Sequence, residues 1–265
     1  WPFQTMREIE VLSPSRASPA PPALPPEWIT QLQALDPRFV VPSSCQFLQE
    51  PWSWYNHAFF PISYRQFESE IGAALPHARV VRMNPSVTMR LDRDGLTPAT
   101  PLDWVLPVGE QDLDYAYDPL AVPPPTGEIA RRFPALNVEQ TARVRDYCRS
   151  GLLDKYRDME LPEDSYFEQP RVWRLSVFDH EGVETRYHYR VHGDSIEAID
   201  AAPLSWTTEI PAAKLYAALE LGESLTSMYM RINDMRFDAA TESDLETAEL
   251  VDDPLIRCLF NDAFG

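Results

Sequence analysis

Three of the five histidines, His180, His188 and His192, lie in one short segment, residues 178–200, among acids and arginines. Histidine and carboxylate side chains that converge can ligate a metal ion or carry out acid–base catalysis. Either role requires the side chains to reach a common point. The local structure of the segment therefore decides what it can do.

Apolar and polar residues alternate over residues 183–192, and this pattern predicts a β-strand with two different faces. The expected core face holds Val183, Thr185, Tyr187, Tyr189 and Val191, and the expected polar face holds Glu184, Arg186, His188, Arg190 and His192. Four residues of extended chain span roughly 13 Å, so His188 and His192 are too far apart to share one metal ion. Two arginines on the same face would also repel a cation. We therefore predict no metal site and a polar sheet surface.

A second set of reactive residues surrounds an aromatic segment, residues 52–60, and an acidic one, residues 110–118. His57 could form an acid–base pair with Asp112 or Asp114, provided that the fold brings the two segments together. Acids at alternating positions resemble a calcium loop, but the glycine and the terminal bidentate glutamate of an EF-hand are missing. A charged loop without catalytic function remains the simpler alternative.

The net charge of the chain is −18, and residues 194–265 are the most acidic part. Such a surface repels nucleic-acid phosphates and anionic lipids and attracts basic proteins. We predict that a basic partner would contact aromatic and acidic side chains, namely Trp52, Trp54, Asp118, Glu242, Asp244, Glu246 and Glu249. Solubility alone, or adaptation to a salty habitat, would also explain the charge.

Several common motifs are absent from the sequence. It has only nine glycines and contains no GxGxxG, GxxxxGK[ST], GxSxG or HExxH pattern, so we predict no cofactor. The three cysteines, Cys45, Cys148 and Cys258, are far apart, which argues against a disulfide framework or a zinc ribbon. No run of 18 apolar residues and no signal peptide is visible, so we expect a cytoplasmic protein without a membrane span.

Short strands predicted at 171–178, 183–192 and 195–200 form an antiparallel meander, and several amphipathic helices surround them in the sequence. Strands and helices do not alternate strictly, so we predict an α+β fold. Residues 1–26 form an N-terminal arm with a proline-rich linker, which could mediate oligomerisation. Residues 27–265 are expected to form a single domain with a long irregular excursion at about 96–130.

The absence of enzyme motifs and the strong acidity favour a binding function. We predict an acidic accessory protein that engages a basic protein partner, as an inhibitor, immunity factor, chaperone or assembly component. The alternative is an enzyme with a dispersed active site near residues 52–60 and 110–118. Neighbouring aromatic side chains and a histidine are the features that support this alternative.

Overall fold

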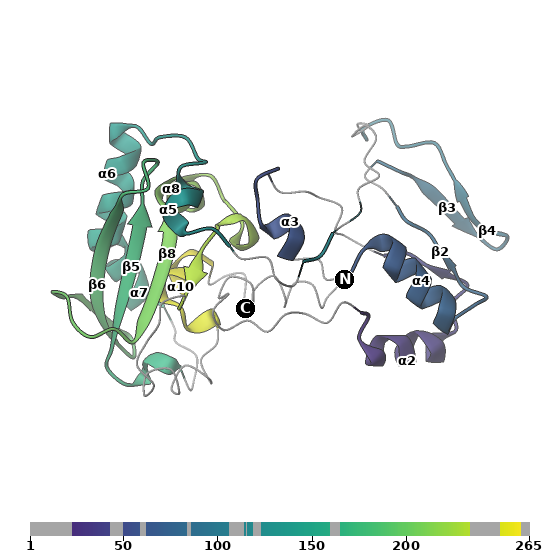
Figure 1. Cartoon of the computed structure of the whole chain (residues 1–265), viewed down its shortest axis with the longest axis horizontal. Coiled ribbons are helices and arrows are strands. Elements are labelled where there is room, and N and C mark those ends of the chain that lie inside the picture. Colours follow the sequence, from purple (N-terminus) through teal and green to yellow (C-terminus); the bar gives the residue numbers. More distant parts are fainter. Residues whose placement is uncertain are drawn as a thin grey trace. The chain divides into compact units, whose positions relative to one another are not determined.

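The computed structural model describes residues 23–42, 50–58, 62–83, 86–105, 114, 116–118, 123–159, 165–233 and 250–260. These residues form two compact units, unit 1 within residues 18–122 and unit 2 within residues 123–265. Figure 1 shows the elements of each unit. The division falls inside the excursion at 96–130 that the sequence predicts. The prediction that residues 27–265 act as one domain stays a prediction, as does oligomerisation through the arm.

Unit 1 is built from short elements around a small apolar cluster. Its helices are α2 (Pro26–Leu35), α3 (Tyr55–Ala58) and α4 (Tyr64–Ala74), and its strands are β1 (Phe39–Val40), β2 (Arg79–Val80), β3 (Met89–Asp92) and β4 (Gly95–Pro98). Strands β1 and β2 are parallel, and β3 and β4 form an antiparallel hairpin. Phe67, Ile71 and Leu75 are buried on one face of the α4 segment, as their helical spacing predicts.

The N-terminus of α4 is capped by Ser63, whose hydroxyl accepts a hydrogen bond from the Gln66 N–H at 3.0 Å. Ser63 and Gln66 have the spacing of a reciprocal capping box. Instead, the Gln66 side chain donates to Glu70 Oε1 at 2.7 Å, one turn further along the helix. The cap is therefore present, and the second half of the box is replaced by a bond within the helix.

Unit 2 contains a mixed five-stranded sheet in the order β7-β6-β5-β8-β9. The strands are β5 (Arg171–Phe178), β6 (Glu184–His192), β7 (Ser195–Ala198), β8 (Trp206–Pro211) and β9 (Arg231–Ile232). The predicted meander is present, since β5, β6 and β7 are consecutive antiparallel neighbours. The chain then crosses over to place β8 parallel to β5, which the meander pattern did not predict. The α+β class is confirmed.

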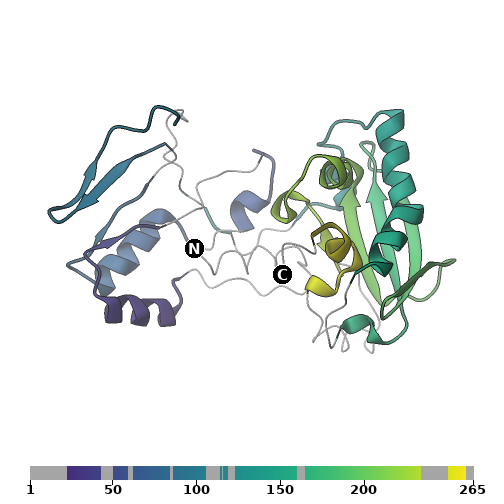
Figure 2. The ribbon, with the colours of Figure 1, turned by 180° about the vertical axis from the view of Figure 1, so that it is seen from behind.

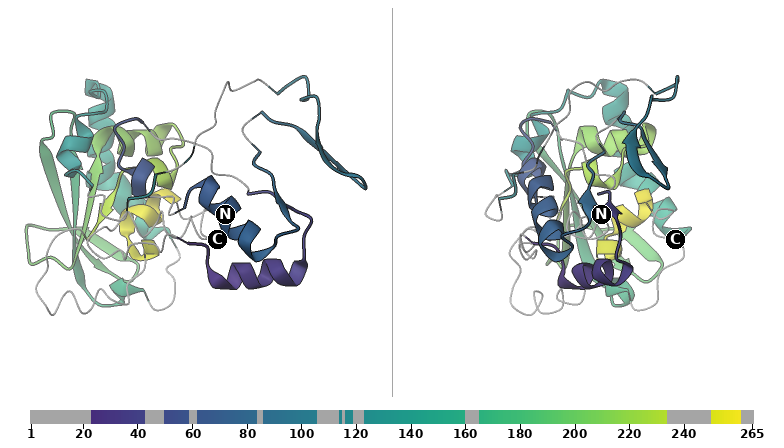
Figure 3. Two further views of the ribbon diagram at one scale, coloured as in Figure 1. Left: turned by 45° about the vertical axis from the view of Figure 1, so that its right-hand side comes forward. Right: turned by 90° about the vertical axis from the view of Figure 1, so that its right-hand side faces the viewer.

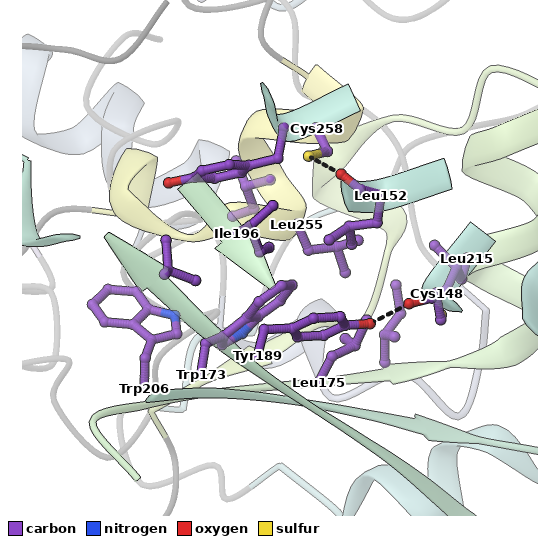
Figure 4. Packing of buried hydrophobic residues seen from close by; sticks show 14 of the residues in the cluster. Cys148, Leu152, Trp173, Leu175, Tyr189, Ile196, Trp206, Leu215, Leu255 and Cys258 are labelled. Atoms are coloured by element: carbon purple, nitrogen blue, oxygen red, sulfur yellow. Dashed lines mark hydrogen bonds between the residues drawn. The ribbon is translucent and has the colours of Figure 1, made fainter. Parts of the chain in front are cut away.

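Helices cover one face of this sheet, as Figure 3 shows. They are α5 (Thr126–Ala130), α6 (Val138–Asp146), α7 (Leu152–Arg157), α8 (Ala212–Glu220) and α10 (Pro254–Phe260), and short 3₁₀ turns occur at Tyr166–Glu168, Leu225–Ser227 and Leu250–Asp252. The covered face supplies the core residues Trp173, Leu175, Val177, Tyr189 and Val191, which pack against buried side chains of α6, α7 and α10 (Figure 4). Val183 departs from the predicted core face, because it lies in the turn before β6 and is exposed.

Helices α6 and α7 are joined by a π-helical turn, Tyr147–Gly151, and together they run along the sheet (Figure 2). Within this turn the Leu152 N–H bonds to the Tyr147 carbonyl, five residues earlier. The Tyr189 hydroxyl, which comes from the sheet, donates to the Cys148 carbonyl at 2.5 Å (Figure 4). The helix thus continues through Gly151, and a buried side chain provides a hydrogen bond to the widened turn.

A buried carboxylate joins the C-terminal helix to the sheet. Asp253 is fully buried and caps α10, accepting hydrogen bonds from the Leu255 and Ile256 N–H groups at 3.0 Å each. Its other oxygen accepts from the Trp206 indole at 2.7 Å and from the Thr208 hydroxyl. Burial raises the pKa of Asp253, and these four donors oppose the shift. The cap of this helix is therefore also a tertiary link.

Candidate functional site

A cavity of about 510 Å³ lies in unit 2, at the end of the sheet where the parallel strands β5 and β8 both finish. Its walls come from the segment before α6, from α6 itself, from the β5–β6 hairpin and from the start of α8. The lining residues are Ala130, Pro134, Leu136, Thr141, Val144, Arg145, Arg149, Val177, Phe178, Asp179, His180, Thr185, Arg186, Tyr187, Ala212 and Ala213. A pocket of this size, mostly apolar with a few polar groups, is typical of small-molecule sites. The carboxyl ends of parallel strands are also a common location for such sites.

The β5–β6 turn carries His180 to the rim of this cavity, and several hydrogen bonds hold the turn in place. The Asp179 carboxylate accepts from the N–H groups of Glu181 and Val183 at 2.9 Å each. The Gly182 N–H closes the turn on the Asp179 carbonyl at 2.9 Å. From outside the hairpin, Arg131 Nε donates to the Glu181 carbonyl at 2.9 Å. The backbone around His180 is thus fixed before any ligand arrives.

Gly182 is required at the end of this turn for two reasons. Its φ of +77° lies in the left-handed region, which residues with a side chain rarely adopt. A Cβ at this position would also come within 2.8 Å of the Gly127 carbonyl oxygen and 3.0 Å of the Arg131 guanidinium. The close approach of Gly127 and Gly182 brings α5 against the hairpin.

The polar groups of the cavity are mainly cationic. Arg145, Arg149 and Arg186 line it together with His180, whereas Asp179 is the single acid among the lining residues. Arg145 pairs with Asp146 at 3.3 Å and Arg186 with Glu184 at 2.7 Å. Arg149 forms no ion pair with another residue in the described part of the chain. The acids Asp146, Glu184 and Asp179 together match the three arginines in number, so the distinguishing feature of the cavity is the guanidinium of Arg149.

Tyr187 is half-buried and lines the cavity. Burial and the neighbouring Cys148 raise the pKa of this phenol, while Arg149 and Arg145 lower it. Because the upward effects prevail, the hydroxyl stays protonated at neutral pH. Tyr187 can therefore donate a hydrogen bond to a ligand and cannot serve as a base.

The polar face of β6 lies on the other side of the sheet, as its alternation predicts. His188 is half-buried and sits directly across from Arg174 on β5. Burial lowers the pKa of His188, Arg174 and Arg186 lower it further, and Glu184 partly opposes them. Within the described ranges, no group of three or more His, Cys, Asp or Glu side chains could hold a metal ion. Two of the three charged groups that act on His188 are arginines, which is a poor environment for a cation.

The acid–base pair predicted in unit 1 is only partly visible. His57 is exposed, and its Nδ1 lies 3.0 Å from the Ala116 carbonyl oxygen. Asp114 accepts a hydrogen bond from the Tyr64 N–H at 2.6 Å and a longer one from the Arg65 N–H at 3.4 Å. Its carboxylate therefore binds the N-terminus of α4. Asp112 lies outside the described residues, and a catalytic pairing with His57 stays a prediction.

The residues predicted to contact a basic partner are divided between several environments. Trp54 is buried, with 8% of its surface exposed, and its ring packs edge-on against Tyr55 at a centroid distance of 4.5 Å. Trp52 is half-buried, and Asp118 is exposed. The four C-terminal acids, Glu242, Asp244, Glu246 and Glu249, lie outside the described residues. Trp54 thus belongs to the interior and is not available as an exposed anchor.

Comparisons with known proteins give few matches. No known protein family matches the sequence, and no curated protein is similar to it. Among solved structures, part of the chain is similar to the MycE methyltransferase from the mycinamycin biosynthetic pathway. One crystal form with Mg and SAH has a TM-score of 0.33 and 16% identity over 51% of this chain and 36% of that one. The complex that also contains mycinamycin VI has a TM-score of 0.33 and 15% identity over 51% and 37%.

The prediction of an acidic binding protein that engages a basic partner is wrong by this comparison, because the similar structures are those of an enzyme. The chain spans little more than a third of the length of that methyltransferase, and the TM-score is low. Methyl-transfer chemistry is therefore not assigned to this chain.

Among the helices of the described residues, none is long and apolar enough to cross a membrane. A cytoplasmic location stays a prediction.

The cavity of unit 2 was not predicted from the sequence. The strand pattern correctly separated the two faces of β6, but it gave no role to His180, which lies in the turn before that strand. The usable signal was the turn sequence DHEG, which places a histidine at the tip of a hairpin.

Proposed function

We propose that the chain is an enzyme that acts on a small molecule bound in the cavity of unit 2. The observation that supports this most strongly is the cavity itself, about 510 Å³ in volume, with an apolar wall and a few converging polar groups. Its position at the ends of the parallel strands β5 and β8 agrees with the usual location of ligand sites in sheets with parallel strands.

His180 is the proposed acid–base residue of this site. An imidazole changes its protonation state near neutral pH, so it can both accept and donate a proton during a reaction. Its turn is held by the bonds of Asp179 and Arg131, which keeps the backbone from moving away from the cavity. Tyr187 would hold a polar atom of the substrate by donating a hydrogen bond.

The proposal is tested by incubating the purified protein with a mixture of small metabolites and following their masses with time. We expect one compound to be consumed and another to accumulate in more than stoichiometric amount. His180→Gln should reduce this turnover by roughly 100-fold, the usual contribution of a general acid or base. The matched control is His192→Gln, because His192 is also exposed on the β5–β6 hairpin and does not line the cavity.

Two results would contradict the proposal. Retention of a compound in a one-to-one ratio without product would indicate a binding protein and not an enzyme. Equal turnover by the wild type and His180→Gln would remove His180 from the chemistry. A loss of turnover that His192→Gln shares would point to an effect on the fold of the hairpin.

A further inference from the structure

The charge of the unit 2 cavity indicates which ligands it can hold. Its single acid, Asp179, already accepts hydrogen bonds from two backbone N–H groups and serves to close the turn. Three arginines line the same cavity. Arg145 and Arg186 already pair with Asp146 and Glu184, so the guanidinium left for a ligand is that of Arg149, which attracts an anion and repels a cation.

Two of the three arginines belong to the helix that forms one wall. Arg145 lies in the last turn of α6 and Arg149 in the π-helical turn that follows it. The buried bond from the Tyr189 hydroxyl to the Cys148 carbonyl, directly before Arg149, anchors this turn to the sheet. The backbone that carries Arg149 is therefore fixed, which lowers the entropic cost of binding an anion. Guanidinium groups bind carboxylates and phosphates through paired hydrogen bonds.

The remaining wall of the cavity is apolar. Leu136, Val144, Val177 and Phe178 line it, and Ala212 and Ala213 leave space at the start of α8. A small inorganic anion would leave this surface in contact with water. A ligand with an apolar body would cover it and gain the free energy of its burial.

We propose that the cavity binds an amphipathic anion, with its carboxylate or phosphate head on Arg145 and Arg149 and its apolar body against Val144, Val177 and Phe178. The inference rests on the proposed function, because it names the class of substrate for the same cavity. It concerns the recognition of the substrate and is independent of the reaction that follows.

Isothermal titration calorimetry of the full chain with octanoate, octyl phosphate and octanol tests this inference. The three probes share one apolar body and differ in the head. We expect both anions to bind and octanol to bind at least tenfold more weakly, because it cannot form charge-assisted bonds. The affinity of the anions should fall as the salt concentration rises. Tighter binding of octanoate than of octyl phosphate would identify a carboxylate substrate, and the reverse order a phosphate ester.

Arg149→Ala should weaken the binding of octanoate by about tenfold to a hundredfold and leave that of octanol unchanged. Arg132→Ala is the matched control, because Arg132 is exposed, lies in unit 2 and does not line the cavity. Equal binding of octanoate and octanol would overturn the inference, as would an absence of binding by all three probes or an equal effect of the two substitutions. Metabolite turnover that depends on His180 would then still support the proposed function, so the two failures are distinguishable.

Discussion

The two units each contain a cavity, and the two cavities differ in how their charges are used. The cavity of unit 1, about 300 Å³, is lined by Pro42, Tyr64, Arg65, Glu68, Val80, Arg82 and Asp114. Its two arginines are balanced by two acids, and Asp114 binds the N-terminus of α4. In unit 2, Arg145 and Arg186 pair with Asp146 and Glu184, Arg149 has no ion pair within the described residues, and a large part of the wall is apolar. Paired charges stabilise a fold, whereas an unpaired guanidinium beside an apolar surface is suited to a ligand.

The sheet of unit 2 shows the same contrast between its two faces. One face carries the aromatic core with Trp173 and Tyr189, whose rings stack at 4.9 Å. The other carries charged residues that pair with one another, such as Arg190 with Glu197 at 2.6 Å. The cavity lies at the end of the sheet, where Thr185, Arg186 and Tyr187 from both faces reach it. The combination of apolar and cationic lining follows from this position.

The largest expected difference concerns the stability of unit 2 in alkaline solution. Burial raises the pKa of both Cys148 and Cys258 to about 12. Between pH 9 and 12 the unfolded chain would lose these protons while the folded chain keeps them, so stability falls as pH rises. The loss is about 1.4 kcal/mol per pH unit for each thiol. Pulse proteolysis with subtilisin between pH 8 and 11, with mapping of the fragments, tests this. As the pH rises, cleavage within residues 123–265 should begin at a lower pH than cleavage within residues 18–122.

The double substitution Cys148→Ala and Cys258→Ala serves as the comparison for this effect. It should reduce the dependence of unfolding on pH above 9, although the smaller side chains lower the stability at neutral pH. An identical pH dependence in both proteins would show that other groups, such as the buried tyrosines, govern alkaline unfolding.

A larger side chain in each cavity tests which one holds the ligand. Ala213→Phe places a ring at the start of α8 within the unit 2 cavity, and we expect octanoate binding to weaken by roughly 100-fold, on the order of the 1–3 kcal/mol cost of overpacking. Val80→Phe makes the matched change in the unit 1 cavity and should leave the calorimetric titration unchanged. If Val80→Phe alone prevents binding, octanoate binds in the cavity of unit 1 and not in that of unit 2.

The rim of the unit 2 cavity can be tested through its glycine. Gly182→Ala meets both a left-handed backbone and a carbonyl oxygen at 2.8 Å, so it should destabilise the protein by about 2–4 kcal/mol in urea unfolding. Gly193→Ala has a φ of +54° and no atom within 4 Å of the added Cβ, so it should cost only about 1 kcal/mol. Metabolite turnover should fall in the first variant only. An equal loss of stability in both variants would mean that the Gly127 carbonyl moves away from the added Cβ easily.

The smallest expected effect concerns the acid of unit 1. Asp114→Ala removes an acceptor from the N-terminus of α4 and should lower the stability by about 1 kcal/mol, measured by thermal unfolding. Octanoate binding and metabolite turnover should stay as in the wild type. Asp118→Ala is the control, because Asp118 is exposed and its substitution removes the same charge from the same segment. A large loss of turnover in Asp114→Ala alone would support the acid–base pair predicted for unit 1.

Local sequence signals predicted the elements that depend on neighbouring residues. Alternation of apolar and polar residues predicted the β5–β6–β7 meander. Asn137 and Gln140 form a complete capping box at the start of α6. Pro211 precedes α8, and Gly222 follows it. Gly222 has a φ of +70°, as the residue after a helix often does. Each of these signals acts within a few residues, which is why periodicity and capping rules detect it.

The cavity depends on contacts that such rules cannot detect. Its walls combine Thr141, Val177, Tyr187 and Ala213, which come together only after β8 pairs with β5 in parallel. The π-helical turn is joined to the sheet by the bond from Tyr189 to Cys148, two residues 41 positions apart. Trp54 failed as a predicted surface anchor for a related reason, because composition does not show which aromatic side chains the fold buries.

A crystal structure of the full chain grown with octanoate would show where this anion binds. We predict that the ligand lies between α6 and the β5–β6 hairpin, with its carboxylate within hydrogen-bond distance of Arg149 and its chain against Val177 and Phe178. An octanoate carboxylate bound instead to Arg65 and Arg82 in the cavity of unit 1, with an empty cavity in unit 2, would show that the anion site is not in unit 2.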